Sequence, residues 1–394
     1  MANLTLKGLF GGKLNLRRDF YKYTLVIELL IVFVTFQMLT GGIFITTRNL
    51  SNLLMQGATC SIISITMMLI LVSCNADLSA GTALGFMGTA AAAMQVYLKW
   101  GTSLSIIAVL VIGLLIGLWH GFWIAYKKLP AFIVTLASQL IFKGLTLLIG
   151  DGKTIGPVNE SFAFIGKDYL PSLFVQPEKF NDSSLIICLL IIILFVANSF
   201  RTRRVKIKEE LPVSSMGFFL VKTLLISLII FVLTSTMIFY KGFSYAVILL
   251  LILAGIFHFV VNNTTFGRHV FAIGGNSEAA RLSGINIERD IMLIYILHSV
   301  VTAIASIVFL GRVGQASATA GTGFEFTAIT GCVVGGTSIL GGRGNVIGAV
   351  IGTMLMAALD NGMSLMNVGA TYQYIIKGLV LMLAIAMDVL SKNR

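Results

Sequence analysis

The sequence has few charged residues. Only 11% of its 394 residues are charged and 57% are hydrophobic, whereas roughly one quarter of an ordinary soluble domain is charged. The charges that are present, 28 Lys and Arg against 16 Asp and Glu, fall in short runs between apolar stretches. These stretches are about 20 residues long, the length that crosses the hydrocarbon core of a bilayer. The sequence therefore excludes a soluble globular domain, and orientation in a membrane explains its positive excess better than binding of nucleic acid.

Residue sets that bind metals or perform catalysis are also missing. The four cysteines and four histidines are dispersed along the chain, without the close spacing of a zinc site or a catalytic triad. They are Cys60, Cys74, Cys188 and Cys332, and His120, His258, His269 and His298. We therefore expect the cysteines to be small core-facing or lipid-facing side chains. We expect no metal, no cofactor and no catalytic residue.

A nucleotide-binding motif is absent as well. In the best candidate, Gly150-Asp-Gly-Lys-Thr154, Leu147 stands where a phosphate loop requires glycine, and Gly8–Lys13 fails in the same way. An autonomous ATP-driven pump is thus disfavoured. Acidic residues in or beside apolar runs lie near the ends of those runs, which favours interfacial positions over proton relays. These acids are Glu28, Asp77, Asp360 and Asp388.

The long apolar runs predict an all-α, polytopic integral membrane protein with about 12 transmembrane helices, in a range of roughly 10–12. The expected spans are 24–43, 54–74, 79–98, 103–126, 130–150, 183–200, 217–239, 243–261, 290–311, 327–340, 345–366 and 372–390. Glycine, with 40 residues, is concentrated at 81–88 and 331–352. Small residues let helices pack closely, but these segments are also typical of broken or re-entrant helices that line a pathway. Both interpretations stay open.

The distribution of basic residues predicts the topology. With both termini in the cytosol, the inside segments hold 18 basic residues and the outside segments hold 7, the bias expected of cytoplasmic loops. The predicted organisation is a basic cytoplasmic N-terminus at 1–23, a transmembrane permease domain at 24–390 and a cytoplasmic tail at 391–394. Within the domain, 151–182 is expected outside, and 201–212 and 263–289 are expected in the cytosol.

The cytoplasmic segment 263–289 is too apolar to be only a linker. Asn276 or Ser277 can cap a helix whose first turn carries Glu278, and Gly284 can end it in a left-handed conformation. The pattern predicts a two-turn helix with small and apolar side chains that nothing in the chain is obliged to bury. It would serve as a docking site for a partner, or else rest on the lipid headgroups.

This segment also carries a resemblance. Phe271-Ala-Ile-Gly-Gly-Asn-Ser-Glu-Ala-Ala-Arg-Leu-Ser-Gly-Ile285 resembles the coupling loop of permease subunits of bacterial monosaccharide ABC importers of the ribose/xylose/galactose type. Further similar stretches are Asn75-Ala-Asp-Leu-Ser-Ala-Gly81, Pro130-Ala-Phe-Ile-Val-Thr-Leu136, Val334-Gly-Gly-Thr-Ser-Ile-Leu-Gly-Gly342 and Leu359-Asp-Asn-Gly-Met363. The similarity runs nearly end to end. It is greatest to the D-xylose and multiple-monosaccharide branch, because the hairpin at 183–239 is missing from the shorter ribose type.

The resemblance implies a membrane-spanning subunit of an ATP-driven importer in the bacterial cytoplasmic membrane. Its implied partners are two ABC ATPase subunits or one tandem ATPase chain, a second permease chain, and an extracytoplasmic sugar-binding protein. The residues implied to contact the ATPase are Gly274, Gly275, Asn276, Glu278, Ala279, Ala280, Arg281, Leu282, Ser283, Gly284 and Ile285. The alternative is a stand-alone sugar facilitator or secondary carrier, while a membrane-embedded enzyme would need a clustered catalytic set.

Four polar residues are candidates for the substrate pathway. Asn75, Gln139 and Asn361 could each donate to a sugar hydroxyl or bond a neighbouring helix. Asp77, at the junction of two expected spans, is predicted to cap the following helix. The rival interpretation of Asp77 is that it binds a sugar hydroxyl beside the pathway.

Overall fold

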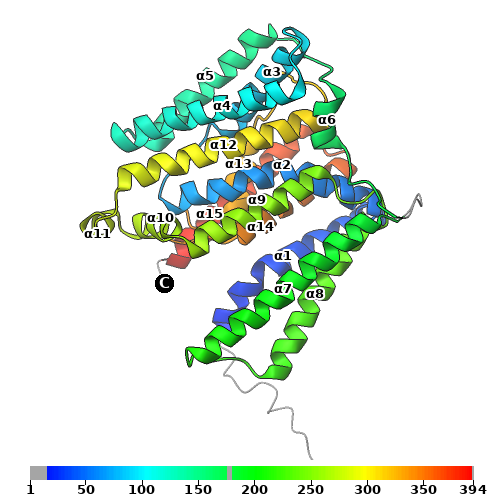
Figure 1. Cartoon of the computed structure of the whole chain (residues 1–394), viewed down its shortest axis with the longest axis vertical. Helices are drawn as coiled ribbons and strands as arrows, with labels where there is room; N and C mark the ends of the chain where they lie inside the picture. Colours follow the sequence, from blue (N-terminus) through cyan, green and yellow to red (C-terminus); the bar gives the residue numbers. More distant parts are fainter. Residues whose placement is uncertain (1–15, 175–179, 393–394) are drawn as a thin grey trace, which may run out of the picture. The chain divides into compact units, whose positions relative to one another are not determined.

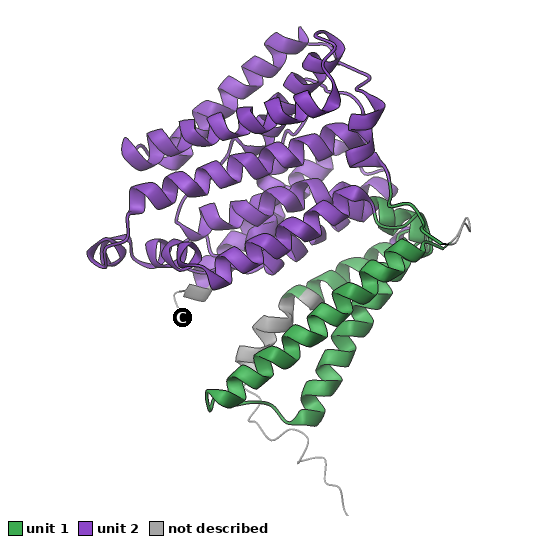
Figure 2. Cartoon of the chain, viewed as in Figure 1, with its two compact units in different colours: residues 1–37, 41–52, 169–243 green, residues 38–40, 53–168, 244–394 purple. Residues whose placement is uncertain are grey.

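The computed structural model describes residues 16–174 and 180–392, so most of the predicted N-terminal segment 1–23 lies outside the described residues. The chain divides into two compact units (Figure 2). Unit 1 consists of residues 1–37, 41–52 and 169–243, and unit 2 of residues 38–40, 53–168 and 244–394.

Unit 2 is a bundle of helices whose centre is formed by α2 (Thr47–Val72), of which it contains residues 53–72, and α12 (Ile287–Val313). Its other helices are α3 (Ala80–Val96), α4 (Thr102–Gly121), the π-helical turn η2 (Phe122–Tyr126), α5 (Ala131–Gly150), α6 (Glu160–Lys167), α9 (Tyr245–Asn263), α10 (Thr265–Gly275), α11 (Ser277–Leu282), α13 (Phe324–Val334), α14 (Val346–Leu365) and α15 (Ala370–Lys392). Helix α12 lies against α4, α3 and α6 (Figure 1). Side chains 62–72 of α2 are all buried.

Glycines bring helix backbones of unit 2 into close contact. A Cβ added to Gly113 of α4 would lie 2.7 Å from Cβ of Ala303 on α12. Helices α13 and α14 cross on glycines of both helices, because a Cβ on Gly352 of α14 would overlap the carbonyl oxygen of Gly331 of α13. The tight-packing interpretation of the glycines is therefore confirmed at these crossings.

The expected span 327–340 is corrected by the structure. Helix α13 ends at Val334, and 335–345 is a loop in which Gly336, Gly341 and Gly342 have φ of +90°, +80° and +74°. Side chains rarely adopt these backbone angles, so a helix cannot continue through this segment. This glycine-rich region is thus a short helix, a loop and the longer helix α14, consistent with a broken segment. The other glycine-rich segment, 81–88, lies within the continuous helix α3, so the broken-helix interpretation is wrong there.

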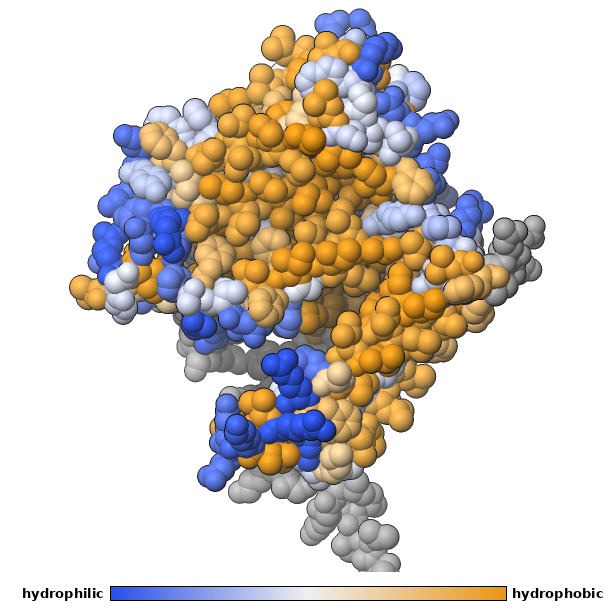
Figure 3. Space-filling view, in the orientation of Figure 1, coloured by the Kyte–Doolittle hydropathy of each residue, from blue (hydrophilic) through white to orange (hydrophobic). Residues whose placement is uncertain are grey.

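Each of the twelve expected spans overlaps a helix, but the structure does not confirm twelve crossings, because α3 and α13 have only 17 and 11 residues. In the described residues, nine helices are long and apolar enough to cross a membrane, while α1 (Leu16–Leu39) and α13 contribute shorter apolar segments, Ile27–Leu39 and Phe324–Val334. On unit 2, hydrophobic residues cover the flank seen in Figure 3 and hydrophilic residues gather toward its ends. The chain is an all-α polytopic membrane protein.

Unit 1 contains α1, the first turn of α2 and a helical hairpin of α7 (Asp182–Lys208) and α8 (Met216–Ile238). Both hairpin helices begin at a side-chain cap. The N–H of Ser184 donates to Asn181 Oδ1 at 2.8 Å, and the N–H of Phe218 donates to Ser215 Oγ at 3.4 Å. The two helices pack against each other, while most of their apolar side chains stay exposed.

Candidate functional site

Helix α11 (Ser277–Leu282) is the short exposed helix predicted within 263–289, and we call it the knob. The N–H of Ala279 donates to Asn276 Oδ1 at 3.0 Å, and Gly284 has φ +83°, so the predicted cap and the predicted left-handed end are both confirmed. Leu282, at the tip, is 89% exposed. A leucine side chain exposed on a capped helix is available for burial by a partner or against lipid headgroups, so both interpretations of the segment stay open.

The preceding helix α10 was not expected from the sequence. It begins at the cap Thr264, whose Oγ1 accepts the N–H of Gly267 at 3.3 Å. The underside of the knob is also less free than expected, because Ala280 is 4% exposed and packs with Ile273 and Ile287. Only the outer face of α11 is therefore open to a partner.

Gly274 seats the knob on the end of α2. A Cβ on Gly274 would overlap the carbonyl oxygen of Val72, whereas a Cβ on Gly275 would have no neighbour within 4 Å. The Cys74 thiol donates to the Gly274 carbonyl at 3.4 Å, and the N–H of Gly342 donates to Val72 O at 2.9 Å. Cys74 is thus an exposed contact at this junction, while the other three cysteines are buried as expected.

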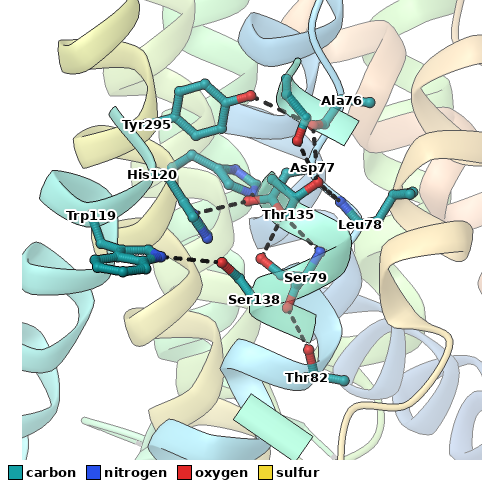
Figure 4. A network of polar contacts seen from close by, with 12 residues as sticks. Ala76, Asp77, Leu78, Ser79, Thr82, Trp119, His120, Thr135, Ser138 and Tyr295 are labelled. Carbon is teal, nitrogen blue, oxygen red and sulfur yellow. Dashed lines mark hydrogen bonds and ion pairs between the residues drawn. The ribbon is translucent and has the colours of Figure 1, made fainter. Parts of the chain in front are cut away.

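Immediately after α2, the Asp77 carboxylate lies in a buried polar cluster (Figure 4). Its Oδ1 accepts the N–H and the hydroxyl of Ser79, both at 2.7 Å. Its Oδ2 lies 3.5 Å from His298 Nε2 and 3.8 Å from His120 Nδ1. Two histidines that are dispersed in the sequence therefore meet one carboxylate in the fold.

These contacts correct two expectations about Asp77. The N-cap of α3 is Ser79, whose side chain makes no capping bond, so Asp77 fixes the turn before the helix and does not cap it. Asp77 is 1% exposed, which also excludes an exposed interfacial position. No group of metal-binding side chains suited to an ion occurs in the part of the chain that the structure describes.

Further bonds tie this cluster to four helices. The Thr66 hydroxyl of α2 lies 3.0 Å from His298 Nδ1, and the N–H of Leu78 donates to Thr135 Oγ1 of α5 at 3.2 Å. The Tyr295 hydroxyl of α12 donates to the carbonyl of Ala76 at 3.5 Å. The 75–79 turn is consequently held by α2, α5 and α12, with His120 of α4 against its carboxylate.

The other predicted pathway residues do not all meet. Gln139 Nε2 donates to Glu325 Oε1 at 3.4 Å, whereas Asn75 Nδ2 donates locally to the carbonyl of Ser73 at 3.0 Å. Asn361 is 8% exposed on α14. Sequence reasoning missed Glu325, which is 1% exposed although it stands in the apolar segment 324–334. An acid inside an apolar run is the signal that could have identified it.

Two of the other acids near apolar runs, Asp360 and Asp388, have partners. Asp360 of α14 forms an ion pair with Lys377 of α15, with 2.8 Å between Oδ2 and Nζ. Asp388 Oδ2 accepts the Ser338 hydroxyl and the N–H of Ile339, both at 3.0 Å. Asp388 therefore anchors the loop after α13, which favours a structural role for this acid.

Comparison with known proteins identifies the family. Residues 49–385 match the family described as branched-chain amino acid transport system / permease component. The chain is 39% identical to the xylose transport system permease protein XylH of Escherichia coli, over 94% of this chain and 92% of that protein. The xylose permease protein XylH of Haemophilus influenzae is 36% identical, over 94% of this chain and 97% of that protein.

A relative named for a different sugar is the galactose/methyl galactoside import permease protein MglC of Escherichia coli, 31% identical over 94% of each chain. No solved structure matches. The predicted resemblance is confirmed by these relatives. A match over most of its length and relatives of this identity show that the chain belongs to this transport permease family and is a multi-pass membrane permease.

Proposed function

We propose that the chain is the membrane-spanning permease subunit of an ATP-driven ABC importer of a monosaccharide, xylose or a related pentose or hexose. The family description mentions branched-chain amino acids, but similar permeases, at 39%, 29% and 31% identity, are named for xylose, ribose and galactose. The observation that carries the proposal is the capped helix α11, which exposes Leu282 while Gly274 seats α10 on the end of α2.

A permease subunit of this kind needs partners that supply energy and deliver the sugar. Two ABC ATPase subunits, or one tandem ATPase chain, bind the outer face of α11 in the cytosol and supply the energy. A second permease chain, in a homodimer or a heterodimer, completes the pathway, and an extracytoplasmic sugar-binding protein delivers the sugar. The bilayer surrounds the subunit, with 151–182 outside and 201–212 and 263–289 in the cytosol.

In this proposal, movement of the ATPases is transmitted into unit 2 by direct contacts between α10, the end of α2 and the 75–79 turn. Gly274 rests on the carbonyl of Val72, and the 75–79 turn that follows carries Asp77. That turn is bonded to α5 and α12 through Thr135 and Tyr295. A shift of α10 and α11 therefore moves the end of α2 and the turn together, which couples the knob to the helices around a pathway near Gln139 and Glu325.

The test uses an exposed leucine on the knob and a matched one elsewhere. Leu282→Ser removes the apolar tip, and Leu211→Ser changes a leucine that is 48% exposed just after the end of α7. In proteoliposomes with the ATPase and the binding protein, we expect Leu282→Ser to lower sugar-stimulated ATP hydrolysis at least about tenfold, and Leu211→Ser to preserve it. Sugar uptake by the chain alone, without ATP, would favour a facilitator and contradict the proposal.

A further inference from the structure

The hairpin of unit 1 contains a pocket that the transport proposal does not use. It lies between α7 and α8 near the turn that joins them, with a volume of about 470 Å³. Its lining includes the cations Arg203, Lys206 and Lys222 and the aromatic residues Phe195, Phe218 and Phe219. None of its lining residues is acidic. Three cations around one pocket favour an anionic ligand.

Arg203 is held in position for such a ligand. Its Nη1 donates to the carbonyl oxygen of Ser214 at 2.8 Å, and its guanidinium carbon lies 4.9 Å from the ring centroid of Phe219. Phe219 also packs edge-to-face on Phe200, with 5.0 Å between ring centroids. Arginine has several N–H donors in a rigid plane, so those not bonded to Ser214 stay available for phosphate oxygens.

The pocket stands at the boundary between basic and apolar surface. Beyond it, α8 exposes apolar side chains such as Val221 and Leu224, which are 58% and 66% exposed. In Figure 3 hydrophilic residues gather at the turn end of the hairpin, and hydrophobic residues cover the length of the helices. A ligand with both a phosphate and acyl chains matches this boundary, whereas a free phosphate would leave the apolar wall unused.

We propose that this pocket binds the phosphate headgroup of an anionic phospholipid, with its acyl chains along the exposed apolar face of α8. Arg203, Lys206 and Lys222 contact the phosphate, and the aromatic residues pack against the glycerol and upper acyl carbons. Because the hairpin belongs to unit 1, this inference stands whichever sugar the permease carries. It assigns to the hairpin a role in anchoring the permease to anionic lipid.

The experiment measures lipid binding to the full-length chain by native mass spectrometry. Purified protein is titrated with phosphatidylglycerol or with phosphatidylcholine of the same acyl chains. The pocket variant carries Arg203→Gln, Lys206→Gln and Lys222→Gln. The matched control carries Arg201→Gln, Arg204→Gln and Lys208→Gln, which remove the same charge from the hairpin but change no residue that lines the pocket.

We expect the wild-type chain and the control variant to prefer phosphatidylglycerol by at least about tenfold, and the pocket variant to lose that preference. If the triple variant does not fold, the single change Lys222→Gln is compared with Lys208→Gln in the same titration. Equal losses in pocket and control variants would overturn the proposal in favour of diffuse attraction. Displacement of the lipid by an equal concentration of inorganic phosphate would also overturn it, because the site would then take a free anion.

Discussion

At the scale of single residues, the buried cluster around Asp77 combines one carboxylate with two histidines. The two Asp77 oxygens have different partners, since Oδ1 fixes the turn through Ser79 and Oδ2 faces His120 and His298. Because the cluster joins a turn to helices far apart in the chain, it restrains the segment that follows the seat of the knob. We expect the carboxylate to contribute more through its hydrogen bonds than through its charge, because Oδ1 accepts two bonds at 2.7 Å while the histidine nitrogens lie 3.5 and 3.8 Å from Oδ2.

Substitution of Asp77 separates these contributions. Asp77→Asn keeps an oxygen for Ser79 and gains N–H donors for the histidine nitrogens, so we expect near-normal thermal stability and transport. Asp77→Ala leaves the buried N–H and hydroxyl of Ser79 without their acceptor, which we expect to cost about 1–3 kcal/mol. Thermal stability is measured by fluorescence-monitored unfolding, and transport is measured by sugar uptake. Lost transport in a stable Asp77→Asn protein would mean that the carboxylate acts on substrate or gating.

Thr66 offers a second test of the cluster. Its hydroxyl is bonded to His298 Nδ1, so Thr66→Val is expected to lower the free energy of unfolding by about 1 kcal/mol. Thr59 is a matched control on the same helix, since it is equally buried and its hydroxyl has no hydrogen bond in the described part of the chain. We expect Thr59→Val to be neutral or slightly stabilising. Equal destabilisation by both changes would show that the bond to His298 contributes nothing.

At the scale of elements, the proposed coupling requires α10 and α11 to move together where Gly274 packs against the end of α2. Gly274→Ala would push its Cβ into the carbonyl oxygen of Val72. We therefore expect α10 and α11 to be displaced from the end of α2, and sugar-stimulated ATP hydrolysis to fall at least about tenfold. Gly255→Ala on α9, outside the residues implied to contact the ATPase, meets no neighbour within 4 Å and should leave hydrolysis within about twofold of wild type. The two variants are compared in the reconstituted complex. Intact coupling in Gly274→Ala would show that this contact does not transmit the movement.

Local signals account for what the sequence could predict about these elements. Asn276 and Gly284 act within a few residues of their own helix, so the beginning and end of α11 could be predicted from capping preferences alone. Helix α10 could not, because Gly267, Gly274 and Gly275 lower its helix propensity and its packing on α2 comes from elsewhere in the chain. The meeting of Asp77 with His120 and His298 depends on how α4 and α12 pack, which no sequence spacing records.

At the scale of the whole molecule, the transport proposal depends on which segments face the cytosol. It requires α10 and α11 on the same side of the membrane as the basic segment 201–212, which the end of α7 and the following turn form, and 151–182 on the other side. Single cysteines in a cysteine-free background test this. Ser172 is a poor position, because its hydroxyl is bonded to Asp182, so we choose Phe174, which is 83% exposed, together with Lys208 and Leu282.

In right-side-out vesicles, an impermeant thiol reagent should label Phe174→Cys at once, and Lys208→Cys and Leu282→Cys only after the membrane is opened. The reason is that 18 basic residues would otherwise face outward against 7 inward, opposite to the bias of cytoplasmic loops. Normal sugar uptake by the cysteine-free chain is the control for its fold. Labelling of Leu282→Cys from outside would contradict the ATPase proposal directly. Labelling of Phe174→Cys and Lys208→Cys from one side would instead show that the count of crossings between them is wrong.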